Sequence, residues 1–289
     1  MKTKILILGF ALSLTLLSCN KEDNGGGGSV SAADAATSAK LDIMNDDVSK
    51  IVEDQLTTSD GILGKTNLAV QDTPVFLPPC ATVTRVPAFG TVITPGTLIT
   101  KTIDFGTTGC PLPNGNVLRG LIVISFTYQP DATSHTITYT FQDLYHNAIK
   151  FNGTKTFTRV MAISTTNPNI HPIVTMNIDI TATLPNGNIV TRVGQRVREI
   201  IEGYNTAIWL DNIYQITGEW TTTFPSGGVQ TSTITTPLRI RMNCPNIVRG
   251  VITINRNGNT ATLDYGNGEC DNLATFTVNG VAHTITLGN

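Results

Sequence analysis

Threonine fills 46 of the 289 positions, and this excess constrains the fold more than any other feature of the sequence. Thr is β-branched and stiff at χ1, so it suits a pleated, half-exposed strand better than a helix. In residues 136–141 every second side chain is apolar, which predicts a strand with one buried face and one face in water. The composition therefore favours an antiparallel β protein.

Glycine and asparagine mark the turns between the expected strands. Asn-Gly is the strongest short hairpin signal, because a type I′ turn needs positive φ at both central residues. The turn signals are Asn114-Gly115, Asn152-Gly153, Asn186-Gly187, Gly227-Gly228, Asn257-Gly258, Asn267-Gly268 and Asn279-Gly280. About a dozen strands spaced in this way over residues 75–289, with one subdivision open near 185–190, predict an all-β fold: a β-sandwich or a rolled β-meander.

One segment before these strands has the helical period instead. Apolar residues recur at spacings of three and four between residues 32 and 60, at Leu41, Met44, Val48, Ile51, Val52 and Leu56. The spacing predicts one amphipathic helix of about 15 to 20 residues. We expect this helix to cover an edge or an end of the β domain; binding a partner is the alternative.

The first thirty residues have the features of an export signal. Two lysines precede an apolar run over residues 5–17, which is too short to span a bilayer comfortably. The end of this run, Leu16-Leu17-Ser18-Cys19, resembles the lipobox of bacterial lipoproteins. That resemblance implies a signal peptide over residues 1–18, a diacylglyceryl group on the Cys19 thiol and a membrane anchor of lipid. An ordinary cleaved signal with an incidental cysteine is the alternative.

Residues 19–31 have the composition of a tether. Lys21, Glu22 and Asp23 follow the cysteine and resemble the export signal on surface-exposed lipoproteins of the Bacteroidota; a generic charged linker is the alternative. The four glycines at 25–28 form a flexible spacer. We therefore expect a lipid-anchored protein of the outer membrane that faces the cell exterior.

Two modules of the chain repeat one pattern. Cys80 and Cys110 enclose a predicted strand pair that ends in Asp-Phe-Gly, and Cys244 and Cys270 enclose one that ends in Asp-Tyr-Gly. Four cysteines besides Cys19 are an even number, as an exported disulfide protein requires. Because the modules match, we predict Cys80–Cys110 and Cys244–Cys270 bonds, each worth on the order of 3.5 kcal/mol by loop-closure entropy. A zinc site would need closely spaced pairs, which the sequence lacks; free buried thiols are the remaining alternative.

Four further segments resemble a group of Bacteroidota surface lipoproteins. They are FNGTKT at 151–156, RVREIIEG at 196–203, DNIYQITG at 211–218 and LDYGNGECDN at 263–272. The resemblance extends over residues 75–289. The group carries no assigned activity, so the resemblance implies a location and a fold but no catalytic residue.

The motifs of common cofactor and metal sites are absent from the sequence. None of the four histidines has helical zinc-site spacing, and no nucleophile elbow, Walker loop or Rossmann fingerprint occurs. A net charge of −2 without a run of Lys or Arg argues against nucleic acid as a partner. We expect neither a cofactor nor a metal. Five oxygen-bearing side chains at 264–272 could bind calcium weakly, but a disulfide-tethered hairpin explains the same residues and is favoured.

Four aromatic residues cluster in one stretch: Tyr204, Trp209, Tyr214 and Trp220. Exposed rings would suit stacking on sugars, whereas buried rings are core residues, the interpretation that we favour.

These observations predict a surface-displayed, non-catalytic domain that works by binding: in adhesion, to a glycan, or to a partner protein of an outer-membrane assembly. The second hypothesis is an accessory carbohydrate-binding lipoprotein with an exposed tryptophan. The third is a secreted hydrolase, which requires carboxylates that converge in a cleft around Asp211 and Glu219.

Overall fold

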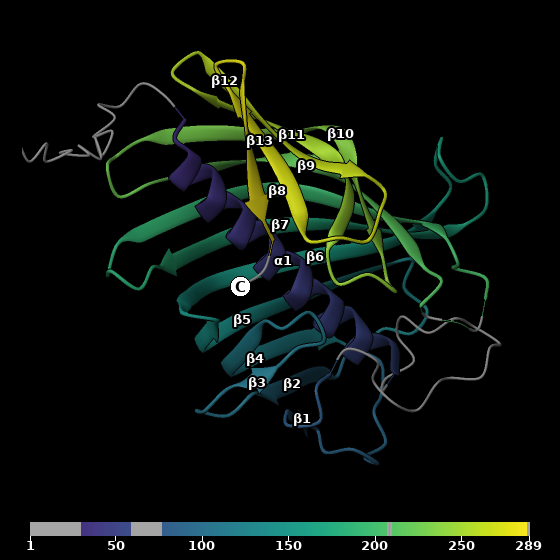
Figure 1. Cartoon of the computed structure of the whole chain (residues 1–289). Helices are drawn as coiled ribbons and strands as arrows, with labels where there is room; N and C mark the ends of the chain where they lie inside the picture. Colours follow the sequence, from purple (N-terminus) through teal and green to yellow (C-terminus); the bar gives the residue numbers. More distant parts are fainter. Residues whose placement is uncertain (1–29, 59–76, 207, 209, 288–289) are drawn as a thin grey trace, which may run out of the picture.

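The computed structural model describes residues 30–58, 77–206, 208 and 210–287. One helix, α1 (Ala32–Thr58), precedes the strands (Figure 1). The strands are β1 (Thr82–Val86), β2 (Leu98–Asp104), β3 (Cys110–Pro111), β4 (Val117–Thr127), β5 (Ser134–His146), β6 (Ile149–Ala162), β7 (His171–Thr183), β8 (Ile189–Glu202), β9 (Ile213–Thr223), β10 (Val229–Arg241), β11 (Ile247–Arg256), β12 (Asn259–Asn267), β13 (Leu273–Val278) and β14 (Val281–Thr286).

All fourteen strands belong to one antiparallel sheet, in which neighbours along the chain pair, except that β2 pairs with β4 and the short β3 also pairs with β4. The all-β prediction is confirmed, and of its two forms the structure is the rolled meander. Residues 185–188 form the turn between β7 and β8, which pair along their whole length within that sheet.

Two of the predicted Asn-Gly hairpin turns are confirmed by positive φ at both residues. Asn257 and Gly258 have φ of 51° and 81° between β11 and β12, as a type I′ turn requires, and Asn279-Gly280 does the same between β13 and β14. Asn152-Gly153 is different, because it lies inside β6 and is not a turn. A Cβ on Gly153 would lie 2.3 Å from the carbonyl oxygen of Asp179, so this glycine permits close approach of β7.

Glycines with positive φ inside strands allow the sheet to roll. Gly120 and Gly250 interrupt the register of β4 with β5 and of β11 with β12, and Gly218 lies against the backbone of β8. Such kinks and bulges bend a strand and increase its twist. The outcome is visible in Figure 1: the sheet curls around α1, with β1–β3 at one end of the roll and β12–β14 at the other.

α1 lies along the concave side of the rolled sheet (Figure 1), which corrects the expected position at an edge. Ser31 Oγ accepts a hydrogen bond from Asp34 N and caps the helix N-terminus. Every residue from Leu41 to Leu56 is buried, charged residues included. The rolled sheet and the loops at its seam bury this part of the helix, so its polar side chains there have protein partners.

Two apolar clusters fix the helix in place. Leu41, Met44 and Val48 pack with side chains of β2–β8, whereas Ala35, Ala39 and Ile43 pack with side chains of β8–β14. Apolar contact on both sides explains why the spacing of three and four appeared in the sequence although residues 41–56 of the helix have no solvent-facing stripe.

The outer face of the sheet accounts for the threonine content. A single row of polar side chains crosses the sheet from β2 to β13, each paired in register with the next. The row is Thr100, Ser125, Thr138, Thr156, Asn177, Gln195, Glu219, Thr233, Thr253, Thr262 and Thr277. Hydroxyl pairs across strands add a small stabilisation and leave this face wet.

A substitution at Gly218 tests the role of the strand glycines. The residue has φ of +134°, and a Cβ there would lie 2.3 Å from Gln195 O. We expect Gly218→Ala to lower the free energy of unfolding by about 2 to 4 kcal/mol, from backbone strain and overpacking. Urea denaturation followed by circular dichroism measures it.

Gly228→Ala is the matched control, because its Cβ would have only ordinary contacts and its φ lies outside the left-handed region. A change below about 0.5 kcal/mol is expected for this control. Equal stability of the two variants would contradict the role given to Gly218.

Candidate functional site

The interior of the roll is charged, with opposite signs on helix and sheet. The buried acidic side chains of this interior come from α1: Asp42, Asp46, Asp47, Glu53 and Asp54. Buried basic side chains come mostly from the sheet: Lys101, Lys155, Arg159, Arg192, Arg196, Arg198 and Arg256, with Lys50 from α1. Buried charges are tolerated where they are paired and hydrogen-bonded. The acidic side chains of the helix therefore face basic side chains of the surrounding sheet.

Asp42 holds the centre of this arrangement. Its Oδ1 accepts hydrogen bonds from Arg192 Nη1 at 2.6 Å and from Arg196 Nη2, and its Oδ2 accepts one from the Tyr265 hydroxyl at 3.3 Å. The Arg196 guanidinium stacks 3.9 Å from the centre of the Trp220 ring. Burial, together with the Asp42 carboxylate, raises the pKa of Tyr265 well above its usual value, so the phenol stays a donor.

A second buried pair joins the C-terminal half of the helix to β8. Arg198 Nη1 lies 3.0 Å from Glu53 Oε1, and its guanidinium stacks on Tyr214. Burial raises the pKa of Glu53, with Arg198 acting in the opposite direction. Lys155 donates a hydrogen bond to Asn45 Oδ1, and its pKa is lowered well below the usual value by burial first and by nearby Arg196.

Asp47 is held by three donors from one end of the sheet. Its oxygens accept hydrogen bonds from Asn114 Nδ2 at 2.8 Å and Asn116 Nδ2 at 2.9 Å, and His146 Nε2 lies 2.8 Å away. These contacts fix residues 112–116, the loop between β3 and β4, against the helix.

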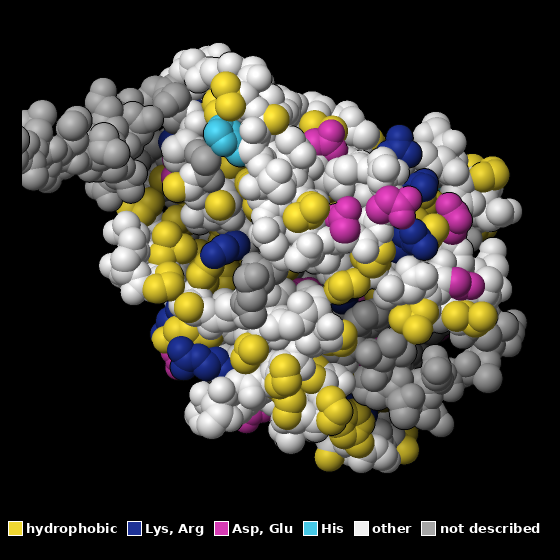
Figure 2. Space-filling view, viewed as in Figure 1, with side chains coloured by type: hydrophobic (Ala, Val, Ile, Leu, Met, Phe, Trp, Pro, Cys, Tyr) yellow, Lys and Arg dark blue, Asp and Glu magenta, His cyan; other side chains and the backbone are white. Residues whose placement is uncertain are grey.

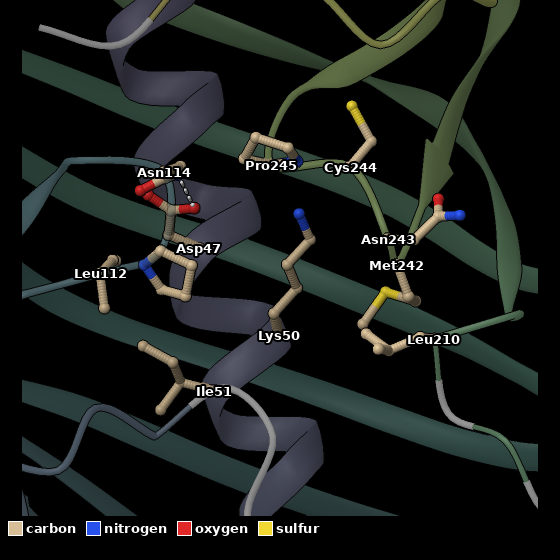
Figure 3. A pocket seen from close by; sticks show the side chains of 11 residues that line it. Asp47, Lys50, Ile51, Leu112, Asn114, Leu210, Met242, Asn243, Cys244 and Pro245 are labelled. Atoms are coloured by element: carbon tan, nitrogen blue, oxygen red, sulfur yellow. Dashed lines mark hydrogen bonds between the residues drawn. The ribbon is translucent and has the colours of Figure 1, made fainter.

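A pocket of about 300 Å³ opens at the seam where this loop faces the turn between β10 and β11 across α1. Figure 3 shows the helix side chains below and the two chain segments on either side. The lining residues are Asp47, Lys50 and Ile51 from α1, Leu112, Pro113 and Asn114 from one wall, Met242, Asn243, Cys244 and Pro245 from the other, and Leu210. The walls are mostly apolar, and the volume is at the lower end of ligand pockets in general.

Lys50 provides the charged group of this pocket. Its side chain is 6% exposed, and in Figure 3 its ammonium points into the space between the walls. The Nζ atom lies 2.8 Å from Asp46 Oδ2, one helical turn earlier. The Asp46 side chain is itself buried and does not line the pocket.

Both predicted disulfides are confirmed, and each supports one wall of the pocket. Cys80–Cys110 ends two residues before Leu112, and Cys244–Cys270 includes a lining residue. Each module also builds the same turn: Gly106 N donates to Asp104 Oδ1 at 2.7 Å, and Gly266 N donates to Asp264 Oδ1 at 2.8 Å. The repeated pattern in the sequence therefore corresponds to two similar supports on opposite sides of the seam.

Of the three described rings of the aromatic cluster, two are buried and none is exposed. Trp220 and Tyr214 are buried core residues that stack on Arg196 and Arg198, which agrees with the favoured core interpretation and removes both rings from contact with a glycan. Tyr204 is half-buried beside the second apolar cluster. Trp209 lies outside the described residues, as does Cys19.

The carboxylates required by a hydrolase do not converge. Asp211 precedes β9 and accepts hydrogen bonds from Thr206 Oγ1, whereas Glu219 lies six residues into the strand, about 20 Å further along at the usual rise. In the loop at 264–272, Asp264, Asn267 and Asp271 accept hydrogen bonds from backbone amides of their own turn. Within the described residues, no group of three or more His, Cys, Asp or Glu side chains could hold a metal ion.

Sequence reasoning missed the residues that matter most here, Asp42, Asp47 and Lys50. A signal was present, because six acidic side chains fall within the helical segment of a chain that is otherwise poor in charge. Their basic partners are too distant in sequence to be recognised as a pattern.

No family model, curated protein or solved structure matches this chain. Among the described residues, no helix is long and apolar enough to cross a membrane. The surface seen in Figure 2 is mostly uncharged, with Lys, Arg, Asp and Glu scattered and not gathered in a patch of one sign.

Asp42→Asn tests the contribution of the central ion cluster. The substitution leaves two buried guanidinium groups without their shared carboxylate. We expect the free energy of unfolding to fall by about 3 to 5 kcal/mol. Asp143→Asn, at an exposed ion pair with Lys150, is the control and should leave the urea midpoint unchanged. Equal midpoints for the two variants would refute the central role of Asp42.

Proposed function

We propose that the chain is a lipid-anchored domain displayed at the outer membrane, which binds a small molecule in the pocket above Lys50 and catalyses no reaction. The observation that carries the binding function is the pocket itself, an apolar space with rigid walls and one buried ammonium. Preformed apolar pockets with few polar groups are typical of small-molecule sites.

The ionisable groups around the pocket support binding over catalysis. Asp47 is engaged by three donors, and Lys50 is paired with Asp46. A general acid or base needs a free proton position within reach of the substrate. These carboxylates instead hold the pocket in shape.

The anchor and the outward location rest on the likeness of residues 16–19 to a lipobox and of residues 21–23 to a surface-export signal. Stable anchoring needs more than one acyl chain, which a lipidated N-terminal cysteine supplies. The glycine tether then holds the folded domain away from the membrane.

Replacing Cys19 tests the anchor. In cells fed a palmitate that carries an alkyne, the natural chain should take up the label, and Cys19→Ser should lose both the label and the membrane association. Retention of the label by Cys19→Ser would contradict lipidation. Replacing Glu22 and Asp23 with alanine should protect the chain from protease added to whole cells, while unchanged digestion would contradict their role in surface display.

Blocking the pocket tests the binding function. Asn243 is exposed at the rim, so Asn243→Trp should fill the opening without disturbing the core. The neutral fluorescent probe N-phenyl-1-naphthylamine should bind the natural chain and lose at least tenfold in affinity with Asn243→Trp. Asn186→Trp, beside a separate cavity over the other half of α1, is the control and should bind as before. Equal binding by all three would contradict the site.

A glycan is the second candidate ligand, on a different surface. A groove of about 680 Å³ lies on the outer face of β6–β10 and is lined by Asn177, Asp179, Gln195 and Glu219 with several threonines. Amide and carboxylate groups of this kind can bond sugar hydroxyls. A glycan array that shows binding lost in Asn177→Ala but kept in Asn243→Trp would favour this candidate.

A further inference from the structure

We infer that the pocket at the seam selects molecules with an apolar body and a terminal carboxylate, which accepts hydrogen bonds from the Lys50 ammonium. This ligand class rests on the proposed binding function and adds to it the chemistry of the polar end. Three features of the structure carry it: the direction of Lys50, the donors that the pocket offers and the charge of the interior.

Lys50 extends from α1, which forms the floor of the pocket, toward the space that a ligand would occupy. Its stem rises from the helix between Asp47 and Ile51, and its ammonium faces the space between Leu112 and Pro245 (Figure 3). An ammonium has three N–H donors, and the Asp46 carboxylate, on the same helix, takes one. The other two donors can therefore be given to an oxygen in the pocket.

Lys50 is the charged donor of the lining, and the carboxylate and the amide beside it, Asp47 and Asn114, are already engaged. Both oxygens of Asp47 already accept hydrogen bonds from the sheet. Asn114 gives its amide to Asp47, and its oxygen accepts from Asn116 N. A ligand ammonium would meet Lys50 with a like charge, whereas a carboxylate meets a donor of opposite sign.

The charged groups around the pocket set the next constraint. Among the buried residues of the described chain, basic side chains outnumber acidic ones, eight against six. Near the pocket Lys50 is paired with Asp46, whose side chain does not line the space, and Asp47 is engaged by His146 and two amides, so of the charged groups there only the ammonium is turned toward a ligand with donors to give. A ligand carboxylate between apolar walls forms a charge-assisted hydrogen bond in a site of low dielectric, where such bonds are strongest.

The apolar walls determine the rest of the ligand. Ile51, Leu112, Leu210, Met242 and Pro245 surround the space above the ammonium. Methionine and leucine adapt to unbranched or ring-shaped apolar groups alike, so the walls select for apolarity and size, while Lys50 selects the end group.

Calorimetry with three probes of equal chain length tests the proposal: decanoate, decanol and decylamine. The protein is the full chain carrying Cys19→Ser. Decanoate should bind at least tenfold more tightly than decanol, and decylamine should bind more weakly than either. Asn243→Trp should abolish binding of all three.

A double variant isolates the charge. Asp46→Asn with Lys50→Met removes both members of the pair, so no buried charge is left alone. Decanoate affinity should fall at least tenfold in this variant, and decanol affinity should change less than twofold. Lys40→Met, at an exposed lysine of the same helix, is the control and should leave both affinities unchanged.

The outcomes separate the ligand class from the binding function. Equal affinity for decanoate and decanol, both lost with Asn243→Trp, would overturn the carboxylate and leave the apolar pocket standing. Binding of none of the probes would overturn the pocket as a site for apolar ligands of this size. If the double variant fails to fold, the preference of the natural chain among the three probes decides the question.

Discussion

The ion cluster of Asp42 with Arg192 and Arg196 is the interaction on which the rest of the structure depends. A helix with six acidic side chains cannot lie in an apolar barrel, and a sheet with seven inward basic side chains cannot close on itself. Each element supplies what the other lacks. The helix thus takes the place that a second sheet occupies in a sandwich, and this explains why a single rolled sheet has a complete interior.

The sheet was predictable because its rules are local. Alternation and Asn-Gly turns identified most strands, since each pairs with the next and the threonines line one wet face. The two-residue β3 was not predicted, because it is too short to show alternation. Both disulfides followed from the matching modules around Asp104 and Asp264.

The surroundings of the helix were not predictable from one sequence. Its apolar spacing indicated a helix correctly, but Asp42, Asp47 and Lys50 have the polarity of a solvent-facing stripe. What buries them is the roll of the sheet, which depends on where glycines such as Gly218 permit close backbone contact. The pocket is a consequence of that roll, so the residues that line it are scattered over 199 positions of the chain, from Asp47 to Pro245, in no recognisable order.

The order of the chain has a consequence for how the protein is made. The strands form by short-range pairing, but α1 comes first and its partners come last: Arg192 lies 150 residues after Asp42, and Tyr265 lies 223 after it. Contacts this distant are slow to form because long loops must close first. The acidic side chains of the helical segment therefore stay in solvent until nearly the whole sheet has been synthesised. The C-terminal strands thus determine when the domain can complete its folding.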